Sequence, residues 1–493
     1  MRWSFMTEMF AKSIYPLANL VLARILVPED FGLFAMAAAV TGLGQLFGDF
    51  GLGRALIQTE ADGKRSANIV FWANTIFSIG LYVIIFFIAP FAASFFREVA
   101  IVPLIRVLSF QIILTALGSA QFSFLQREFK FKSIFFCGLG LAFFSATISI
   151  WLAFLGYGVF ALVIGTLSGS MAQTILLWKV ISWHPDFSFD IALAKKLFYF
   201  GGWLMIESLL VWIMVRGEII VIGRFLGLRD TGIYSFAATL TALIFGTIFN
   251  PMLSILYSSF SRLKSQVYEL PSSFLKISKI TSYMALPIAV GLALTASPFT
   301  AVILGPKWQG IEKIIFLLSF AYGVSWMVGI NNGLYRAMGK PEVNSKIMVL
   351  SLLIYLPVYV FAAAKGIIVF CAAKILLEII HAVIQSFWVH NLLKINLFYL
   401  LDRAKIAFLS VVIMGGIVYY AIGLIGPFQG YFGLLKLLIL ILLGVISYGF
   451  GLYLLDRIFL KQFLRLIKKS LGGRIRTPHH LEKSKNEMSS QDF

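Results

Sequence analysis

Long apolar runs joined by short polar connections are the feature that most constrains this chain. The segments 81–89 and 347–364 hold no charged residue, and neither alternates apolar with polar side chains as a membrane β-strand does. A membrane-spanning helix uses about 20 apolar residues, so a chain of 493 residues has room for about twelve to fourteen such helices. The sequence therefore predicts an all-α polytopic membrane protein.

Composition supports this fold class. Charged residues make up 13% of the chain, against roughly 25% in soluble domains. The net charge of +19 comes from Lys and Arg scattered between the apolar runs, so we expect no nucleic-acid partner. Cys137 and Cys371 both lie inside apolar runs, which leaves neither a disulfide framework nor a Cys-based zinc site. We therefore expect no metal and no cofactor.

The apolar runs form two groups of about six helices and a final pair. We expect a six-helix lobe over 1–181, a cytoplasmic linker over 182–196, a second six-helix lobe over 197–393, a further helix pair over 394–458 and a basic, partly disordered cytoplasmic tail over 459–493. The predicted spans are 5–26, 31–57, 67–91, 100–125, 134–155, 159–181, 197–226, 232–260, 274–304, 311–337, 347–364, 367–393, 407–425 and 432–455. A total of twelve helices stays open as an alternative to fourteen.

Basic residues recur on every second connection between these spans. Short cytoplasmic loops carry an excess of Lys and Arg, and the basic connections lie around residues 64–65, 127–132, 179–196, 262–279, 336–346 and 394–405. The connections between them hold few basic residues. This pattern predicts that both termini are cytoplasmic.

An internal repeat relates the two halves of the chain. The stretch Ala23–Phe34 aligns without gaps with Gly223–Tyr234, so that Arg, Leu, Asp and Gly recur at matched places. About six helices separate the two copies. Because that number is even, both copies have the same orientation, and we expect a parallel pseudo-twofold repeat about an axis along the membrane normal, with a central cleft between the lobes.

Several short motifs carry a resemblance to a known family. They are the segments 22–24, 28–32, 49–58, 126–131, 249–260 and 305–308. In order and spacing they resemble the polysaccharide-transporter and O-unit flippase branch of the MOP (MATE-like) exporter superfamily, and are similar to the colanic-acid and teichuronic-acid exporters. The resemblance implies a flippase of the bacterial inner membrane that moves undecaprenyl-pyrophosphate-linked oligosaccharide by alternating access, for surface polysaccharide biosynthesis. It also implies a polysaccharide polymerase and chain-length machinery as partners.

Charged residues within the seventh predicted helix are candidates for mechanism, because a charge inside a span costs about 2.5–3.5 kcal/mol on insertion scales. Glu207 and Glu218 fall on one face at about 100° per residue, and Arg216 points nearly opposite to Glu207. We interpret the two carboxylates as proton or sodium sites and Arg216 as a ligand of the diphosphate. The alternative is a buried ion pair that fixes helix packing.

The twelfth predicted helix carries a second set of candidates. Lys374, Glu378 and His381 follow the spacing i, i+4, i+7 and therefore lie on one stripe. Lys374 can neutralise phosphate, whereas Glu378 and His381 can take up or release a coupling proton. The alternative is a Lys–Glu pair within the helix and a structural histidine.

Three further arginines and two amides complete the predicted site. Arg24 and its repeat mate Arg224 lie near the periplasmic ends of their helices, and Arg54 lies near a cytoplasmic end. A guanidinium suits bidentate contact with phosphate, although all three can instead snorkel or pair with nearby aspartates. Asn74 and Asn250 are candidate contacts for the sugar.

Two other classes of function remain open from sequence alone. An ion-coupled multidrug exporter of the same superfamily would share the lobes and cleft. A membrane polysaccharide polymerase or acyltransferase would also be long and apolar, but would show a large extracytoplasmic loop or a cluster of histidines, and the chain has five His in all. It contains no G-x-x-x-x-G-K-[ST] motif for ATP. We therefore expect a transporter and not an enzyme.

Overall fold

The computed structural model describes residues 12–58, 63–186, 190–263, 270–428, 430, 432–459 and 461. Within these residues every regular element is a helix. Almost all of the predicted tail, 459–493, lies outside the described residues, as do the first residues of the first predicted span.

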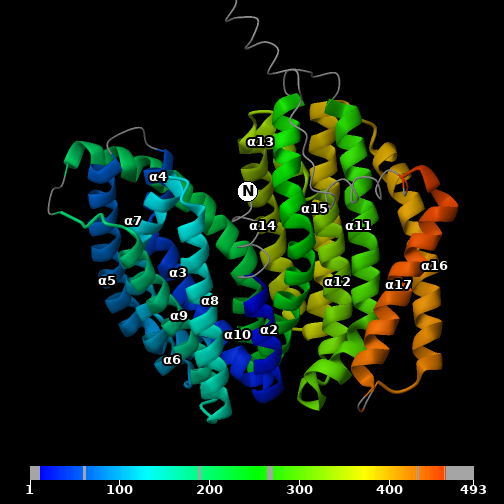
Figure 1. The fold of residues 1–493 in the computed structure, drawn as a ribbon, viewed down its shortest axis with the longest axis horizontal. Coiled ribbons are helices and arrows are strands. Elements are labelled where there is room, and N and C mark those ends of the chain that lie inside the picture. The colour runs from blue at the N-terminus through cyan, green and yellow to red at the C-terminus, as the bar shows by residue number, and fades with distance from the viewer. Residues whose placement is uncertain are drawn as a thin grey trace, which may run out of the picture.

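The helices fall into two groups on either side of α2 and α10 (Figure 1). The first part of the chain forms α2 (Lys12–Ile25), α3 (Pro28–Asp49), α4 (Leu52–Gln58), α5 (Gly63–Phe96), α6 (Ile101–Leu108), α7 (Phe110–Arg127), α8 (Phe131–Phe154) and α9 (Val159–Val180). The second part forms α10 (Ile191–Leu263), α11 (Leu270–Phe299), η3 (Thr300–Leu304), η4 (Pro306–Trp308), α12 (Ile311–Val328), α13 (Asn331–Ala337), α14 (Pro341–Ala363) and α15 (Ile367–Leu393). We call α3–α9 the first bundle and α11–α15 the second bundle.

Eleven helices or helix pairs of the described residues are long and apolar enough to cross a membrane. The shorter apolar segment Ile14–Ile25 of α2 and the long helix α10 are additional to these. The many spans confirm the predicted fold class of an all-α polytopic membrane protein, whereas the total of fourteen stays a prediction.

The long helix α10 contains a break at Gly227, whose φ of 84° and ψ of −169° are not helical. Glycine adopts this backbone conformation at no steric cost because it has no Cβ. The matched position in the repeat is Val27, which separates α2 from α3 in an extended conformation with φ of −103° and ψ of 159°. The chain therefore changes direction at the same place in both copies of the repeat.

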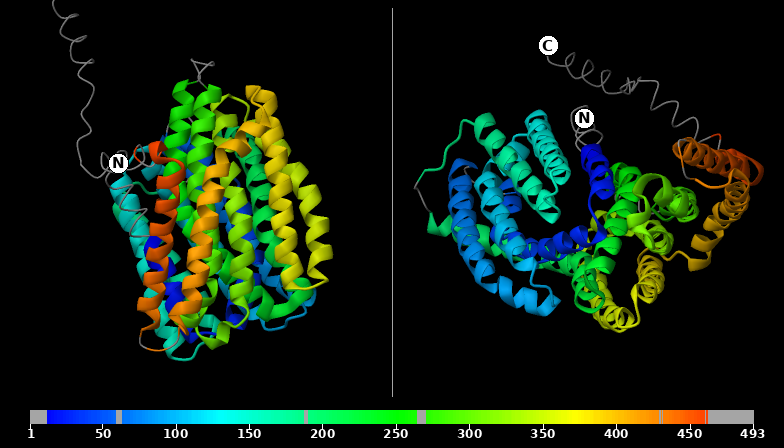
Figure 2. Two further views of the ribbon diagram at one scale, coloured as in Figure 1. Left: turned by 90° about the vertical axis from the view of Figure 1, so that its right-hand side faces the viewer. Right: turned by 90° about the horizontal axis from the view of Figure 1, so that it is seen from below.

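A final helix pair, α16 (Leu397–Ile425) and α17 (Gly433–Leu455), packs on the outer side of the second bundle (Figure 2). Val411, Met414 and Val418 of α16 are buried in a cluster with Leu286 and Val290 of α11. At one end of the pair, Asp456 accepts hydrogen bonds from Lys279 at 2.5 Å and from the hydroxyl of Tyr283 at 2.9 Å. Both apolar and ionic contacts therefore fasten this pair to α11.

The two copies of the repeat approach each other closely at a reciprocal contact of two glycines. A Cβ on Gly32 would lie 2.1 Å from the carbonyl oxygen of Leu228, and a Cβ on Gly232 would lie 1.8 Å from that of Pro28. Gly32 matches Gly232 in the repeat, and Pro28 matches Leu228. A contact in which each copy presents the same residues to the other is what a twofold axis through this point would produce.

Polar contacts surround this glycine crossing. Arg24 donates to the carbonyl oxygens of Val302 and Ile303 at 3.2 and 3.0 Å. The indole of Trp308 donates to the carbonyl oxygen of Ala23 at 2.7 Å, and Arg229 lies 3.1 Å from Glu29. We call this set of contacts the junction.

We predict that Gly232→Ala destabilises the protein. The new methyl group would overlap a backbone oxygen, which cannot turn aside as a side chain can, and overpacking of this kind costs about 1–3 kcal/mol or more. Thermal unfolding of the purified protein measures the effect. Gly291→Ala on α11 is the matched control, because a Cβ there meets nothing within 4 Å. Equal melting temperatures for the two variants would contradict the prediction.

Candidate functional site

Two cavities meet between the bundles at Arg216 of α10. One has a volume of about 370 Å³ and reaches into the first bundle, and the other, of about 590 Å³, reaches into the second. Arg216, Ser235 and Thr239 line both. We call the first the amide cavity and the second the carboxylate cavity.

The course of α10 explains why Arg216 lies between the bundles. Near its start, Gly201 packs on Gly51, so that a Cβ on Gly51 would lie 2.5 Å from the Gly201 carbonyl oxygen. Further along, Glu218 bonds to Lys374 of α15. The first half of α10 therefore passes from the first bundle to the second, and Arg216 lies on the crossing segment.

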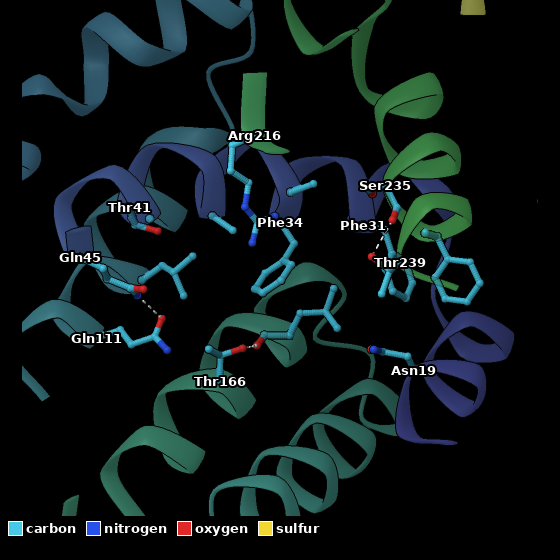
Figure 3. A pocket seen from close by; sticks show the side chains of 16 residues that line it. Asn19, Phe31, Phe34, Thr41, Gln45, Gln111, Thr166, Arg216, Ser235 and Thr239 are labelled. Carbon is cyan, nitrogen blue, oxygen red and sulfur yellow. Dashed lines mark hydrogen bonds between the residues drawn. The ribbon is translucent and has the colours of Figure 1, made fainter. Parts of the chain in front are cut away.

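The amide cavity is polar but holds no acidic residue in its lining. Gln45 donates to Gln111 at 2.9 Å, and Gln111 donates to Ser170 at 3.0 Å. Figure 3 shows the two glutamines and Thr41 at one end of the cavity, with Asn19 at the other and the guanidinium of Arg216 directed between them. Amides and hydroxyls both donate and accept hydrogen bonds, so this lining suits a neutral ligand rich in hydroxyl groups.

Arg216 has no carboxylate within ion-pair distance among the described residues. Its side chain is exposed within the cavities, and every other charged residue that lines them lies on the carboxylate side. A guanidinium without a protein partner is free to form two parallel hydrogen bonds with a phosphate or carboxylate. The meeting point of the cavities therefore carries a positive charge that no carboxylate of the described residues neutralises directly.

The carboxylate cavity is built around a buried ion pair. Glu218 of α10 accepts hydrogen bonds from Lys374 and from the hydroxyls of Tyr234 and Tyr359, the last at 2.9 Å. The side chains of Lys374 and Glu218 are only 8% and 11% exposed. Buried charges are tolerated when they are paired and hydrogen-bonded. The hydroxyls of the two tyrosines supply the hydrogen bonds that the Glu218 carboxylate needs in addition to the ion pair.

Glu378 lies one turn from Lys374 and also lines the carboxylate cavity. Its side chain is hydrogen-bonded to Ser325. The ion pair of Lys374 is with Glu218 rather than within its own helix, which the spacing of Lys374 and Glu378 alone could not reveal. Together the two cavities contain Arg216 and Lys374 against two carboxylates, so their formal charges balance.

His381 lies beyond these cavities on the same stripe of α15. Its Nδ1 lies 2.9 Å from the hydroxyl of Ser351, and its Nε2 lies 3.3 Å from the amide of Gln385. Gln385 in turn accepts a hydrogen bond from Tyr335 at 2.8 Å. The spacing i, i+4, i+7 thus places His381 in a separate polar network.

Three other predicted site residues lie in separate contacts outside the two cavities. Glu207 lies 3.6 Å from Arg336 of α13, whereas Arg24 lies in the junction. Arg224 lies over the ring of Phe95, with 5.7 Å between Cζ and the ring centroid. None of these three lines the amide or carboxylate cavity.

The remaining three candidates also lie apart from Arg216. Arg54 donates to the hydroxyl of Ser208 at 3.0 Å and lines a further cavity inside the first bundle. Asn74 is fully buried inside the same bundle, and Asn250 is exposed on α10.

Sequence reasoning missed the uncharged residues of the site. Gln45 and Gln111 line the amide cavity, and Tyr234 and Tyr359 bind Glu218. One signal was available, because Tyr234 is the repeat mate of Phe34 and each lines one of the two cavities.

Helices that can cross a membrane, together with polar cavities between two bundles, define a polytopic membrane protein of the transporter type. Comparison with known proteins makes this specific. Residues 21–313 match the family described as Polysaccharide biosynthesis protein, and the chain belongs to that family.

Curated relatives agree with the family match. The chain is 24% identical over 348 residues to the Teichuronic acid biosynthesis protein TuaB of Bacillus subtilis (strain 168), which covers 69% of this chain and 71% of that protein. It is 23% identical over 393 residues to the Lipopolysaccharide biosynthesis protein WzxC of Escherichia coli (strain K12), covering 78% and 79%. The resemblance drawn from the motifs is thereby confirmed.

Solved structures share the fold. The Lipid II flippase MurJ in an inward closed conformation has a TM-score of 0.75 at 16% identity, covering 92% of this chain and 98% of that one. An inward-facing multidrug resistance MATE family transporter of the MOP superfamily has a TM-score of 0.63 at 17% identity, covering 78% and 94%. These likenesses confirm the predicted fold class of an all-α polytopic membrane protein.

Proposed function

We propose that this protein is a flippase that moves undecaprenyl-pyrophosphate-linked oligosaccharide across the bacterial inner membrane by alternating access. The observation that carries the proposal is the unpaired Arg216 at the meeting point of two polar cavities. The relatives support the substrate class, since their names assign them to teichuronic acid and lipopolysaccharide biosynthesis. The protein is a transporter and not an enzyme.

The division of the cavities matches the parts of such a substrate. Arg216 binds the diphosphate, because a guanidinium can hold two phosphate oxygens at once. Gln45, Gln111 and Asn19 contact the sugar hydroxyls on the side of the first bundle. The lipid tail stays outside in the membrane, where it needs no polar partner.

Orientation follows from the basic connections. With both termini in the cytoplasm, the junction lies near the periplasmic face and holds the bundles together there. The cavities then receive substrate from the cytoplasmic leaflet. Release to the periplasm requires the contacts of Gly32 with Leu228 and of Gly232 with Pro28 to separate. A polysaccharide polymerase and its chain-length machinery would use the product.

The carboxylate cavity contains the residue that would couple transport to an ion gradient. Among the described residues Glu378 has no ion pair like that of Glu218, and it is the carboxylate available to a coupling proton. Neutralising Glu378 leaves the cavities with one excess positive charge. An anionic substrate is then favoured, which links ion uptake to substrate binding.

A multidrug exporter is the second candidate, because a MATE family transporter shares the fold. An unpaired arginine at the centre of the site disfavours cationic drugs by electrostatic repulsion. The same charge favours a diphosphate.

Deletion of the gene tests the proposal. We expect lipid-linked oligosaccharide to accumulate on the cytoplasmic side, where a periplasmic labelling enzyme cannot reach it, and we expect the wild-type gene to restore labelling. If the intermediate still reached the periplasm but stayed unpolymerised, or if only drug sensitivity changed, the flippase assignment would be wrong.

A further inference from the structure

Inside the first bundle lies a small polar cavity, which shares Gln45 with the amide cavity. Its volume is about 60 Å³, and its lining combines Asp49 of α3, Asn74 and Ser78 of α5, and Thr115 and Ser119 of α7. Three helices therefore converge on it. We call it the Asp49 cavity.

Two oxygen atoms in the Asp49 cavity lack any hydrogen-bond partner in the structure. The amide oxygen of Asn74 and the hydroxyl of Ser78 are both buried, in side chains that are 0% and 1% exposed. A buried polar atom without a partner costs about 1–3 kcal/mol. Two such atoms in one cavity indicate that something else satisfies them.

The orientation of Asn74 is fixed by its neighbours. Its Nδ2 donates to Asp49 Oδ1 at 3.2 Å and to the hydroxyl of Ser119 at 2.9 Å. Turning the amide over would set its oxygen against the carboxylate, so the nitrogen stays on the Asp49 side. The Asn74 oxygen is therefore held as an acceptor without a donor.

The hydroxyls of the third helix also present lone pairs. Thr115 donates its proton to the carbonyl oxygen of Gln111 at 2.8 Å, and Ser119 donates to that of Ala116 at 3.0 Å. Because each hydroxyl has used its one proton, only acceptor capacity remains for the cavity. With the Asp49 carboxylate and the Asn74 oxygen, these lone pairs form a set of oxygen ligands that suits a cation.

The charge and size of the cavity select the kind of cation. Asp49 is the one acidic residue in its lining, and a single carboxylate neutralises a single positive charge. A divalent ion would leave an uncompensated charge inside the bundle, which is costly. Carboxylate, amide and hydroxyl oxygens are ligands for hard ions, and 60 Å³ holds a small ion with about one or two waters.

An entry path is present. A larger cavity of about 440 Å³ shares Asp49, Thr115 and Ser119 with the Asp49 cavity. Arg54 lines this larger space and attracts Asp49, but its Nη2 donates to Ser208 of α10. The guanidinium of Arg54 is therefore hydrogen-bonded to α10. Because Arg54 does not line the Asp49 cavity, the oxygen ligands there stay open to another cation.

We propose that Asp49, Asn74 and Ser78, with the hydroxyls of Thr115 and Ser119, bind a sodium ion inside the first bundle. This site is separate from the carboxylate cavity of the second bundle. Sodium bound here ties α3, α5 and α7 together next to the segment where α4 meets α10. Its presence stabilises the first bundle and the packing of Gly51 on Gly201.

Thermal unfolding of the purified full-length protein tests the site. At fixed pH and ionic strength, we expect sodium chloride to raise the melting temperature along a saturating curve, and potassium or choline chloride to have no such effect. Asp49→Asn should abolish the sodium response. Ser78→Ala removes one ligand and should weaken the apparent sodium affinity by about tenfold or more, since even outer contacts of a metal site contribute that much.

Two control variants distinguish sodium in the Asp49 cavity from sodium bound elsewhere in the protein. Ser66→Ala removes another buried hydroxyl without a partner on the same helix but outside the cavity, and should keep the full sodium response. Glu378→Gln should also keep it. If all three salts gave the same melting temperature, the cavity would hold water only. If Glu378→Gln removed the response and Asp49→Asn kept it, sodium would bind in the second bundle. Either result would overturn the proposal.

Discussion

Arg216→Ala is expected to abolish flipping while the protein still folds and reaches the membrane. Removing one partner from a desolvated charge pair costs about 2–5 kcal/mol in affinity, which corresponds to at least about a thirtyfold loss. Folding is spared, because Arg216 forms no ion pair among the described residues and faces the cavities. The measurement is the fraction of lipid-linked oligosaccharide that a periplasmic enzyme labels in cells that carry only the variant.

Two further variants show whether the loss comes from the guanidinium itself. Arg216→Lys keeps the charge but loses the bidentate geometry, so we expect it to retain part of the activity. Arg457→Ala removes an exposed arginine that lies over Tyr453 and outside both cavities, and should behave as wild type. Equal activity of Arg216→Ala and wild type at equal membrane levels would exclude Arg216 as the diphosphate ligand.

The fold was predictable from the sequence because lipid imposes simple rules. In hydrocarbon the backbone N–H and C=O groups must be hydrogen-bonded within the segment itself, as they are in a helix. Each apolar run of sufficient length therefore predicts one membrane-spanning helix. The break at Gly227 fell between the predicted spans 197–226 and 232–260, although α10 is otherwise one long helix. The repeat also predicted which glycines would be equivalent. It did not predict that Gly32 and Gly232 would face each other's backbones, because contact distances depend on how the helices cross.

The site was only partly predictable, for a different reason. Charges in apolar runs stand out, and this identified Arg216, Glu218 and Lys374. Their pairing could not be read from spacing, because residues 156 apart in sequence meet only after α10 and α15 have packed. Helical spacing favoured Glu378 as the partner of Lys374. The amides Gln45 and Gln111 were not singled out, because an uncharged side chain stands out less in an apolar run than a charged one.

The paired charges and the unpaired charge serve different purposes in this arrangement. Glu218 and Lys374 are buried and neutralise each other, so they cost little while the pair is intact. They also connect α10 to α15, close to the segment of α10 that crosses from the first bundle to the second. A substrate that binds Arg216 therefore contacts the same helix that carries Glu218 and is held by Lys374. Movement of α10 would be transmitted through this pair.

Lys374→Met is expected to destabilise the protein strongly, and Glu218→Gln less so. Breaking a buried pair by removing one partner costs about 3–5 kcal/mol, because the other charge stays buried and unpaired. Glu218 would then keep only the hydroxyls of Tyr234 and Tyr359. In the reverse case Lys374 can turn to Glu378 on its own helix, which lies four residues away. Melting temperatures of the purified variants measure this difference.

The double variant Glu218→Gln, Lys374→Met separates stability from function. Replacing both charges removes the unpaired group, so the melting temperature should recover most of the loss caused by Lys374→Met alone. If the pair transmits movement of α10, this stable double variant should still fail to flip substrate. A double variant that transports normally would show that the pair only fixes helix packing, and one as unstable as Lys374→Met would contradict the energetic coupling of Glu218 with Lys374.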